Sequence, residues 1–384
     1  MNTQRRLLVL LVLCAVPLLL AFGRLNEGDS RSKSFNVGKG GTLEVNVDGG
    51  DIMINVWDKN EVYVKAEGID EDDIDHLKMS QSGNDVRVEF RNRWGSSSHM
   101  RFEVSVPSQY NASLHTAGGD IEVRGTMNGT VKGSTSGGNV TLGNVVGGRV
   151  DLSTSGGDMR TGDIQADVTL RTSGGNIDLG AVGGEVNVST SGGNITVKSV
   201  GKSLRASTSG GDIEIGDVGG EAKVSTSGGG IKVRKVSGSA TMSTAGGNIE
   251  LTSASGYVKA NTAGGDIELR NISGSIEAST AGGDVNAELR PSGKGKSKLS
   301  SAGGEITLAI PEDAKATIEA TIRIEGRWGS RKGEYKVRSE FKADTYEQDQ
   351  DEREIRATYK LNGGGDLIEL KTVNSDINIR KLQK

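Results

Sequence analysis

The sequence contains very few cysteine, proline and aromatic residues. Cys14 is the only cysteine among 384 residues, so an internal disulfide framework is excluded. There are four prolines, and phenylalanine, tryptophan and tyrosine together make up 4% of the chain. Between Asn111 and Arg327 the one aromatic residue is Tyr257. This long stretch therefore lacks the stacking platforms of a sugar-cleaving cleft and predicts a thin interior of small aliphatic side chains.

The chain also lacks a strong charge of either sign. Without Arg5 and Arg6 it carries 44 basic and 50 acidic residues, a net charge of −6. No basic stretch stands out as a patch, so the composition argues against a nucleic-acid partner. The three histidines, His76, His99 and His115, do not show the spacing of a metal site.

The one long hydrophobic run lies at the N-terminus, and residues 1–23 are predicted to be a signal peptide or a membrane anchor. Arg5 and Arg6 precede the apolar run 7–22, and small residues at positions 21 and 23 suit cleavage before Arg24. An uncleaved anchor is the alternative, because the run is near the short end for a membrane span. We expect an exported protein in the periplasm, at the cell surface or anchored in the membrane. Any membrane contact is expected only through this segment, if it stays uncleaved.

What the chain has in abundance is glycine, with 58 residues, many of them in doublets. From His115 to Gly304 the sequence repeats Ser-Thr-Ser-Gly-Gly-Asp/Asn-Ile, a few further residues, and Val-x-Gly. The doublets are separated by steps of 19, 19, then 18 seven times, then 21, which is a period typical of repeat architectures. They begin at Gly118, Gly137, Gly156, Gly174, Gly192, Gly210, Gly228, Gly246, Gly264, Gly282 and Gly303.

One repeat predicts two short strands separated by glycine corners. Between Gly210 and Ser227, Ile213 and Ile215 alternate with polar residues, and Ala222 and Val224 do so in the second half. Alternation with period two indicates strands with one buried face. The glycines are expected to supply the backbone angles that a tight corner needs.

A half-repeat cannot bury its apolar face alone, so the repeats are expected to stack. Two strands back to back make one flattened coil, and coils stacked about 4.8 Å apart pair their backbone amides. The sequence therefore predicts an all-β fold, a single parallel β-solenoid of about 18-residue coils with β-rich caps at both ends. Eleven doublets imply a rod of about 50 Å before the ends are counted. A three-sided coil with about six residues a side is the alternative cross-section.

The predicted domain order follows from where the repeat begins and ends. After the segment 1–23, an N-terminal β cap is expected over 34–110, the solenoid over 111–304 and a C-terminal β cap over 305–384. In the first cap, Trp57, Phe90, Trp94 and Phe102 are expected to form a thicker core. In the second, a charged excursion is expected between Arg327 and Arg353, followed by a return to the repeat from Gly363. Caps are needed because an open solenoid end would pair with other chains.

These features resemble a bacterial envelope family of β-strand-repeat proteins of unknown function, often labelled putative adhesins. The resemblance is carried by the stretch from Phe102 to Ile121, by the Ser-Thr-Ser-Gly-Gly corners and by the closing stretch from Leu370 to Ile377. It covers roughly residue 34 to the end. It implies a fold and a location rather than a reaction, and no catalytic residues are carried over from it.

The residues after the glycine doublets form a column that could carry chemistry. Asn and Asp at corners usually hydrogen-bond to backbone groups. Calcium binding is the alternative, but calcium-binding nonapeptide repeats have a third glycine and then an aspartate where this chain has Ile213 and Ile215. We therefore favour the structural role. The column comprises Asp120, Asn139, Asp158, Asn176, Asn194, Asp212, Gly230, Asn248, Asp266, Asp284 and Glu305.

Two further groups have a polar composition that suggests a ligand. The acidic cluster of Glu71, Asp72, Asp73 and Asp75 could hold a divalent cation, but a solvated turn or the start of a short helix is favoured. The threonines of the Ser-Thr-Ser corners could form an ice-binding array, but parity places threonines such as 190 and 208 inward. A packed threonine ladder is therefore expected.

The column of residues next to the corner on the outer face mixes both charges. Part of it alternates in sign, so some neighbouring coils should attract by a few tenths of a kcal/mol a pair. The column runs Glu122, Thr141, Arg160, Asp178, Thr196, Glu214, Lys232, Glu250 and Glu268.

The sequence thus favours an exported, non-enzymatic β-solenoid that acts as an adhesion surface or structural scaffold at the bacterial cell envelope. Its expected partner is an unknown envelope protein or a surface glycan. One alternative is a periplasmic or membrane-tethered partner of an envelope-stress or signalling system, contacted through the caps. Another is a polysaccharide-acting β-helix enzyme. No catalytic, cofactor-binding or metal-binding residue is assigned, because no nucleophile, paired carboxylates or phosphate-binding glycine turn before a helix is recognisable.

Overall fold

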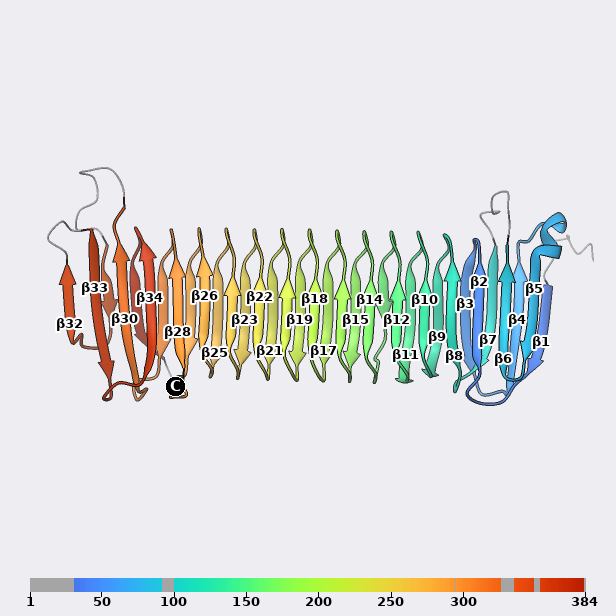
Figure 1. Cartoon of the computed structure of the whole chain (residues 1–384), viewed down its shortest axis with the longest axis horizontal. Helices are drawn as coiled ribbons and strands as arrows, with labels where there is room; N and C mark the ends of the chain where they lie inside the picture. The colour runs from blue at the N-terminus through green and yellow to red at the C-terminus, as the bar shows by residue number, and fades with distance from the viewer. Residues whose placement is uncertain (1–30, 92–99, 294, 326–334, 349–352, 383–384) are drawn as a thin grey trace, which may run out of the picture.

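The computed structural model describes residues 31–91, 100–293, 295–325, 335–348 and 353–382. The predicted segment 1–23, His99 and Trp94 lie outside these residues. The described chain forms two long sheets stacked face to face along a straight rod (Figure 1). No described helix is both long and apolar enough to cross a membrane.

Sheet A contains seventeen strands among the described residues. In spatial order these are β1 (Arg31–Asn36), β4 (Glu61–Glu67), β7 (Arg101–Pro107), β3 (Asp51–Trp57), β9 (Ile121–Asn128), β11 (Val140–Gly147), β13 (Met159–Thr161), β15 (Ile177–Val182), β17 (Ile195–Val200), β19 (Ile213–Val218), β21 (Ile231–Val236), β23 (Ile249–Ala254), β25 (Ile267–Ile272), β27 (Val285–Leu289), β29 (Ile306–Ile310), β35 (Ile377–Lys381) and β31 (Val337–Ser339).

Sheet B is stacked face to face with sheet A. Its described strands, in spatial order, are β5 (Leu77–Ser82), β6 (Asp85–Phe90), β2 (Thr42–Val47), β8 (Asn111–Thr116), β10 (Val131–Ser134), β12 (Val150–Ser153), β14 (Val168–Arg171), β16 (Val186–Ser189), β18 (Leu204–Ser207), β20 (Ala222–Ser225), β22 (Ala240–Ser243), β24 (Val258–Asn261), β26 (Ile276–Thr280), β28 (Lys296–Ser301), β34 (Asp366–Val373), β30 (Ala316–Arg323), β33 (Glu354–Leu361) and β32 (Thr345–Gln348). With about 4.8 Å between strands, each sheet is about 80 Å long.

The predicted β-solenoid is confirmed, with two strands a coil rather than the three-sided alternative. Strands in neighbouring coils pair in parallel and in register, so Ile213 lies beside Ile195 on one side and Ile231 on the other. Inward columns therefore stack like upon like, and Ile213, Ile215 and Val224 are each about 1% exposed. Burying one such side chain stabilises the fold by about 1.5–3 kcal/mol.

The expected reason for the glycine doublets is wrong in part. The glycines of the eleven doublets from Gly118 to Gly304 do not have the positive φ that favours glycine, although Gly50 in the early corner does, with a φ of 90°. The second glycine of each doublet is needed because the coils approach closely: a Cβ on Gly211 would lie 2.2 Å from the carbonyl oxygen of Gly193. The stacked corners thus leave no space for a side chain at this second position, which explains why glycine recurs there at every coil.

At the N-terminal end, the chain does not add its strands in sequence order. The coil β2–β3 stacks in parallel directly on β8–β9, so the early glycine corner at Gly49–Gly50 belongs to the solenoid ladder. Strands β6 and β7 pair in parallel with β2 and β3 and add one more coil, whereas β1–β4, β4–β7 and β5–β6 are antiparallel. The change to antiparallel pairing ends the stacked coils.

The C-terminal end is built in the same way. Strand β34 pairs in parallel with β28 on one side and β30 on the other, and β35 lies between β29 and β31. The last coil of the sequence is therefore inserted inside the cap, and the predicted return to the repeat after Gly363 is confirmed. Beyond it, β30, β33 and β32 are antiparallel neighbours.

The aromatic core of the first cap is smaller than expected. The rings of Phe90 and Phe102 lie 6.0 Å apart and are fully buried, and Tyr110 joins them at 1% exposure. Trp57 was predicted to be in this core but is only partly buried. Its indole nitrogen donates a hydrogen bond to the Glu61 carbonyl at 2.8 Å, and Lys59 lies 4.6 Å from the ring. Its polar edge keeps it at the surface.

Candidate functional site

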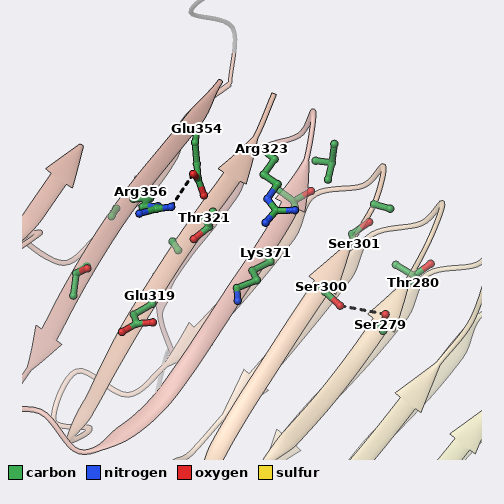
Figure 2. Close-up of a pocket in the computed structure, with 16 residues that line it drawn as sticks. Ser279, Thr280, Ser300, Ser301, Glu319, Thr321, Arg323, Glu354, Arg356 and Lys371 are labelled. Atoms are coloured by element: carbon green, nitrogen blue, oxygen red, sulfur yellow. Dashed lines mark hydrogen bonds and ion pairs between the residues drawn. The ribbon is translucent and has the colours of Figure 1, made fainter. Parts of the chain in front are cut away.

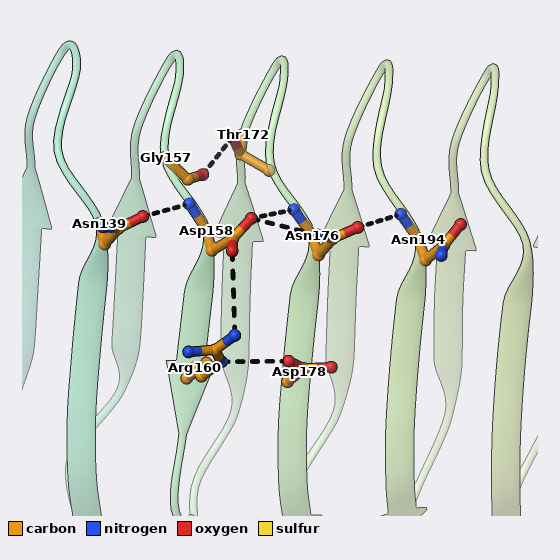
Figure 3. Close-up of polar contacts among 8 residues, drawn as sticks. All are labelled: Asn139, Gly157, Asp158, Arg160, Thr172, Asn176, Asp178 and Asn194. Atoms are coloured by element: carbon orange, nitrogen blue, oxygen red, sulfur yellow. Dashed lines mark hydrogen bonds and ion pairs between the residues drawn. The ribbon is translucent and has the colours of Figure 1, made fainter.

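The Asn and Asp residues after the glycine doublets form a hydrogen-bonded ladder along one edge of the rod (Figure 3). In each step the side-chain Oδ1 of one coil accepts a hydrogen bond from the backbone N–H of the equivalent residue in the next coil. These distances are 2.7–3.0 Å from Asp51 to Asp212 and from Asn248 to Glu305. Asp212 also accepts from the Gly230 N–H, but Gly230 offers no side chain to the next step. The column is thus used to join coils.

The threonines of the Ser-Thr-Ser corners point inward, as predicted. Thr190 and Thr208 are 6% and 7% exposed. The Thr208 hydroxyl donates to the Gly193 carbonyl at 2.9 Å and accepts from the Gly211 N–H at 3.4 Å. Each threonine therefore links its own glycine corner to that of the previous coil, and the hydroxyl array is not offered to solvent.

The outer face of sheet A carries the mixed charges expected from the sequence. Arg160 and Asp178 on neighbouring coils form an ion pair at 3.3 Å, and Lys232 and Glu250 form another at 3.3 Å. Both pairs are exposed, so each contributes only a few tenths of a kcal/mol. A shallow groove of about 800 Å³ crosses this face, and Lys198 lines it without an ion-pair partner among the described residues.

The outer face of sheet B carries Tyr257, the one aromatic residue between Asn111 and Arg327. The Tyr257 hydroxyl donates to Glu277 at 2.6 Å, and the Lys259 ammonium donates to the other carboxylate oxygen at 2.7 Å. Burial of the ring and the hydrogen bond to Glu277 raise the pKa of Tyr257 to about 12. Hydrogen bonds from Lys259 and Tyr257 lower the pKa of Glu277. The carboxylate is thus held ionised between two donors.

A hollow of about 560 Å³ lies on sheet B where the solenoid meets the C-terminal cap (Figure 2). Its lining comes from β26, β28, β34, β30 and β33, which are far apart in the sequence but adjacent in the sheet. Hydroxyl groups line it together with charged side chains at Glu319, Arg323, Glu354, Arg356 and Lys371. We call this the C-terminal hollow.

The other polar residues singled out in the sequence are not brought together. Glu71, Asp72, Asp73 and Asp75 lie in the short 3-10 helix η1 (Glu71–His76), where His76 is 3.5 Å from Asp73. His115 lies at the end of β8 and contacts the Ser134 hydroxyl at 2.7 Å. Among the described residues, no group of three or more histidine, cysteine, aspartate or glutamate side chains is arranged to hold a metal ion.

The C-terminal hollow was not predicted from the sequence. Its charged residues stand at alternate positions of 316–323 and 354–361, which indicates two exposed strand faces. Nothing in that pattern tells that a strand from 366–373 is inserted beside them. The alternating charges were the one signal in the sequence for these exposed faces. The insertion of β34 beside β30 brings the charged residues next to the serines of β26 and β28.

A family model described as Toastrack DUF4097 matches the chain twice, over residues 41–216 and 201–380. Solved structures also align with the chain. A putative adhesin from Parabacteroides distasonis ATCC 8503 is 16% identical, with 68% of this chain and 98% of that one covered and a TM-score of 0.35. One from Bacteroides fragilis NCTC 9343 is 13% identical, with 73% and 97% covered and a TM-score of 0.29. A putative lipid binding protein from Parabacteroides distasonis ATCC 8503 is 15% identical, with 74% and 94% covered and a TM-score of 0.23. No curated protein matches the chain in sequence.

Proposed function

Since the chain belongs to the Toastrack DUF4097 family, a β-repeat family of unknown function and putative-adhesin type, we propose that it is an exported, non-enzymatic scaffold or adhesion surface at the bacterial cell envelope. The observation that carries the proposal is the unbroken parallel ladder from β2–β3 to β34–β35. It repeats each outward position at the spacing of one coil, about 4.8 Å. A rigid face of this kind suits many weak contacts acting together.

The chemistry of the outward groups supports a binding rather than a catalytic role. The corner carboxylates accept hydrogen bonds from backbone amides, and several of those on the sheet faces are paired with lysine or arginine. A carboxylate satisfied in this way is a poor general base, because its charge is already stabilised.

The location is proposed from the N-terminal sequence. Arg5, Arg6 and the apolar run 7–22 have the pattern of a secretion signal. Cell fractionation, with sequencing of the N-terminus of the protein recovered, tests this directly. We expect the chain in the envelope or outside the cell, beginning at Arg24 if the signal is cleaved. A cytoplasmic protein that retains Met1 would refute the proposed location.

The adhesion surface is tested on the full chain with two sets of variants. In the first, Lys198, Lys232 and Arg234 on the sheet A groove are changed to serine. In the second, Tyr346, which is 50% exposed on β32 of the cap, is changed to serine. If the solenoid face makes the contact, only the first set weakens binding of the labelled protein to isolated envelopes.

The exposed Tyr346 favours a second candidate, a partner of an envelope-stress or signalling system contacted through the cap. Large exposed aromatic side chains often anchor protein–protein contacts. Loss of envelope binding in the Tyr346 variant alone would favour this candidate and would exclude the face of the solenoid as the contact.

A further inference from the structure

The C-terminal hollow has a floor of small hydroxyl side chains. Ser279, Ser300 and Thr321 stand on β26, β28 and β30, with Lys371 of β34 between the last two. The Ser300 hydroxyl donates to Ser279 at 3.2 Å, and both serines are partly exposed. Longer charged side chains stand to one side of Ser279 and Ser300, on β34, β30 and β33 (Figure 2). The hollow therefore lies where small hydroxyl side chains meet longer charged ones on neighbouring strands.

The charged rim leaves one guanidinium available. Glu354 is the register partner of Arg323 across β30 and β33, yet Glu354 accepts from Arg356 of its own strand at 2.8 Å. Arg323 is exposed and makes no ion pair or side-chain hydrogen bond with any described residue. In Figure 2 its guanidinium extends toward the hydroxyl-lined floor rather than toward Glu354.

A second cation lies beside the floor and is only weakly engaged. Lys371 is 3.3 Å from Glu369, whereas Lys296 approaches the same carboxylate to 2.6 Å. Glu369 already has its close partner, so the Lys371 ammonium can turn toward a ligand at little cost. Arg323 and Lys371 stand on adjacent strands, two residues apart in register. Together they can place two positive groups at one side of a hydroxyl-lined surface.

We propose that the C-terminal hollow binds a carboxylate-bearing carbohydrate, such as a uronic acid residue within a glycan. A guanidinium can bind a carboxylate through two parallel hydrogen bonds. The serine and threonine hydroxyls can both donate to and accept from sugar hydroxyls. The volume of about 560 Å³ falls within the usual size of a small-ligand site, about 300–1,000 Å³. This inference deepens the proposed surface role and rests on it for its biological setting.

The position of the hollow suits such a role. It lies at the end of the rod opposite β1, the first described strand (Figure 1). Ten strands of sheet B lie between β6 and β26, so a chain held at its N-terminus would carry the hollow about 50 Å away from the N-terminal cap.

The test is isothermal titration calorimetry of the full chain with a galacturonic acid trimer, at low and high salt. A neutral glucose trimer and inorganic phosphate are the comparison ligands. Arg323→Gln removes the available guanidinium. Arg205→Gln is the matched control, because Arg205 is an exposed arginine on the same face of sheet B and has no ion-pair partner among the described residues. Circular dichroism verifies that both variants keep the strand content of the wild type.

We expect the acidic trimer to bind the wild type and the Arg205 variant alike, and the Arg323 variant at least about tenfold more weakly. Binding should also weaken at high salt. Equal affinity in the Arg323 variant, or no binding by the wild type, would overturn the proposal. Equal affinity for the neutral trimer would show that the carboxylate is not recognised. Equal affinity for phosphate would show that the sugar is not recognised. None of these results changes where the protein is located or whether the face of the solenoid binds envelopes, so the two proposals fail separately.

Discussion

Asp158 Oδ1 accepts a hydrogen bond from the backbone N–H of Asn176, one coil away, at 2.8 Å. The same oxygen lies 3.3 Å from the Asn176 side-chain amide, and Arg160 joins the neighbouring Asp178 at 3.3 Å (Figure 3). A side chain at each corner thus satisfies a backbone donor that strand pairing leaves free. Since the contact repeats along the rod, a polar column that might suggest a metal site is part of what holds the coils in register.

Restoring the missing side chain at Gly230 should stabilise the protein. A Cβ there would have its nearest neighbour at 3.4 Å, an ordinary contact, and φ is not positive. We expect Gly230→Asn to raise the free energy of unfolding by about 1 kcal/mol, because it removes backbone freedom from the unfolded chain and supplies an acceptor for the Asn248 N–H. Urea unfolding followed by circular dichroism measures this.

Gly230→Ala separates the two contributions, because alanine restricts the unfolded chain without supplying the acceptor. It should gain about half as much stability as the asparagine variant. If both variants are less stable than the wild type, the ladder does not extend through this corner in the way described.

The two glycines of one doublet should respond very differently to alanine. A Cβ on Gly119 would lie 2.1 Å from the carbonyl oxygen of Gly50, whereas a Cβ on Gly118 meets no atom within 4 Å. We expect Gly119→Ala to lower the free energy of unfolding by about 3 kcal/mol, because backbone must move, and Gly118→Ala to change it little. Thermal unfolding of the two variants compares them. Equal loss in both would show that backbone angle, rather than close approach, selects glycine here.

Much of the fold could be predicted because the repeat fixes it. The period locates each coil, and the alternation of apolar residues such as Ile213 and Ile215 identifies the buried face. The insertion of β34–β35 within the cap could not be predicted, because strands of similar pattern can pair in several orders and the sequence does not encode which neighbour is chosen.

The polar residues of the candidate sites differ in how well the sequence predicts their contacts. The inward threonines followed from parity, and the corner Asn and Asp residues from their preference for backbone hydrogen bonds. Arg323 gave no such signal: its availability arises because Glu354 bonds to Arg356 instead. Arg323 and its register partner Glu354 are 31 residues apart in the sequence. The geometry of the side chains decides which arginine Glu354 contacts, and no periodic pattern in the sequence describes that geometry.

Removing the hydroxyl of an inward threonine should weaken one corner of the rod. Thr208→Val keeps the shape but leaves the Gly193 carbonyl without its donor and the Gly211 N–H without its acceptor. We expect a loss of about 1–3 kcal/mol. Hydrogen exchange should show faster exchange confined to the coils next to residue 208.

The control for this change is Ser209→Ala, since Ser209 is exposed and its side chain makes no hydrogen bond with any described residue. It should leave the unfolding midpoint and the exchange rates as they are in the wild type. An equal loss in the two variants would argue against the threonine ladder as the stabilising contact.

The stability contribution of Tyr257 should depend on pH at the alkaline end. Burial first, and then the hydrogen bond to Glu277, raise the pKa of the folded phenol to about 12, compared with an ordinary value of 10.0. A raised folded pKa means that the contribution is fully present below the unfolded pKa and is lost as pH rises through 10 to about 12. Ionisation would place the phenolate beside the Glu277 carboxylate. The difference in unfolding midpoint between wild type and Tyr257→Phe should therefore shrink or reverse over this range.

Glu277→Gln should bring the pKa of Tyr257 only part of the way back, because burial of the ring remains. Ultraviolet titration of the phenol in both chains measures this, and a Tyr257 that titrates near 10 in the wild type would contradict the contact.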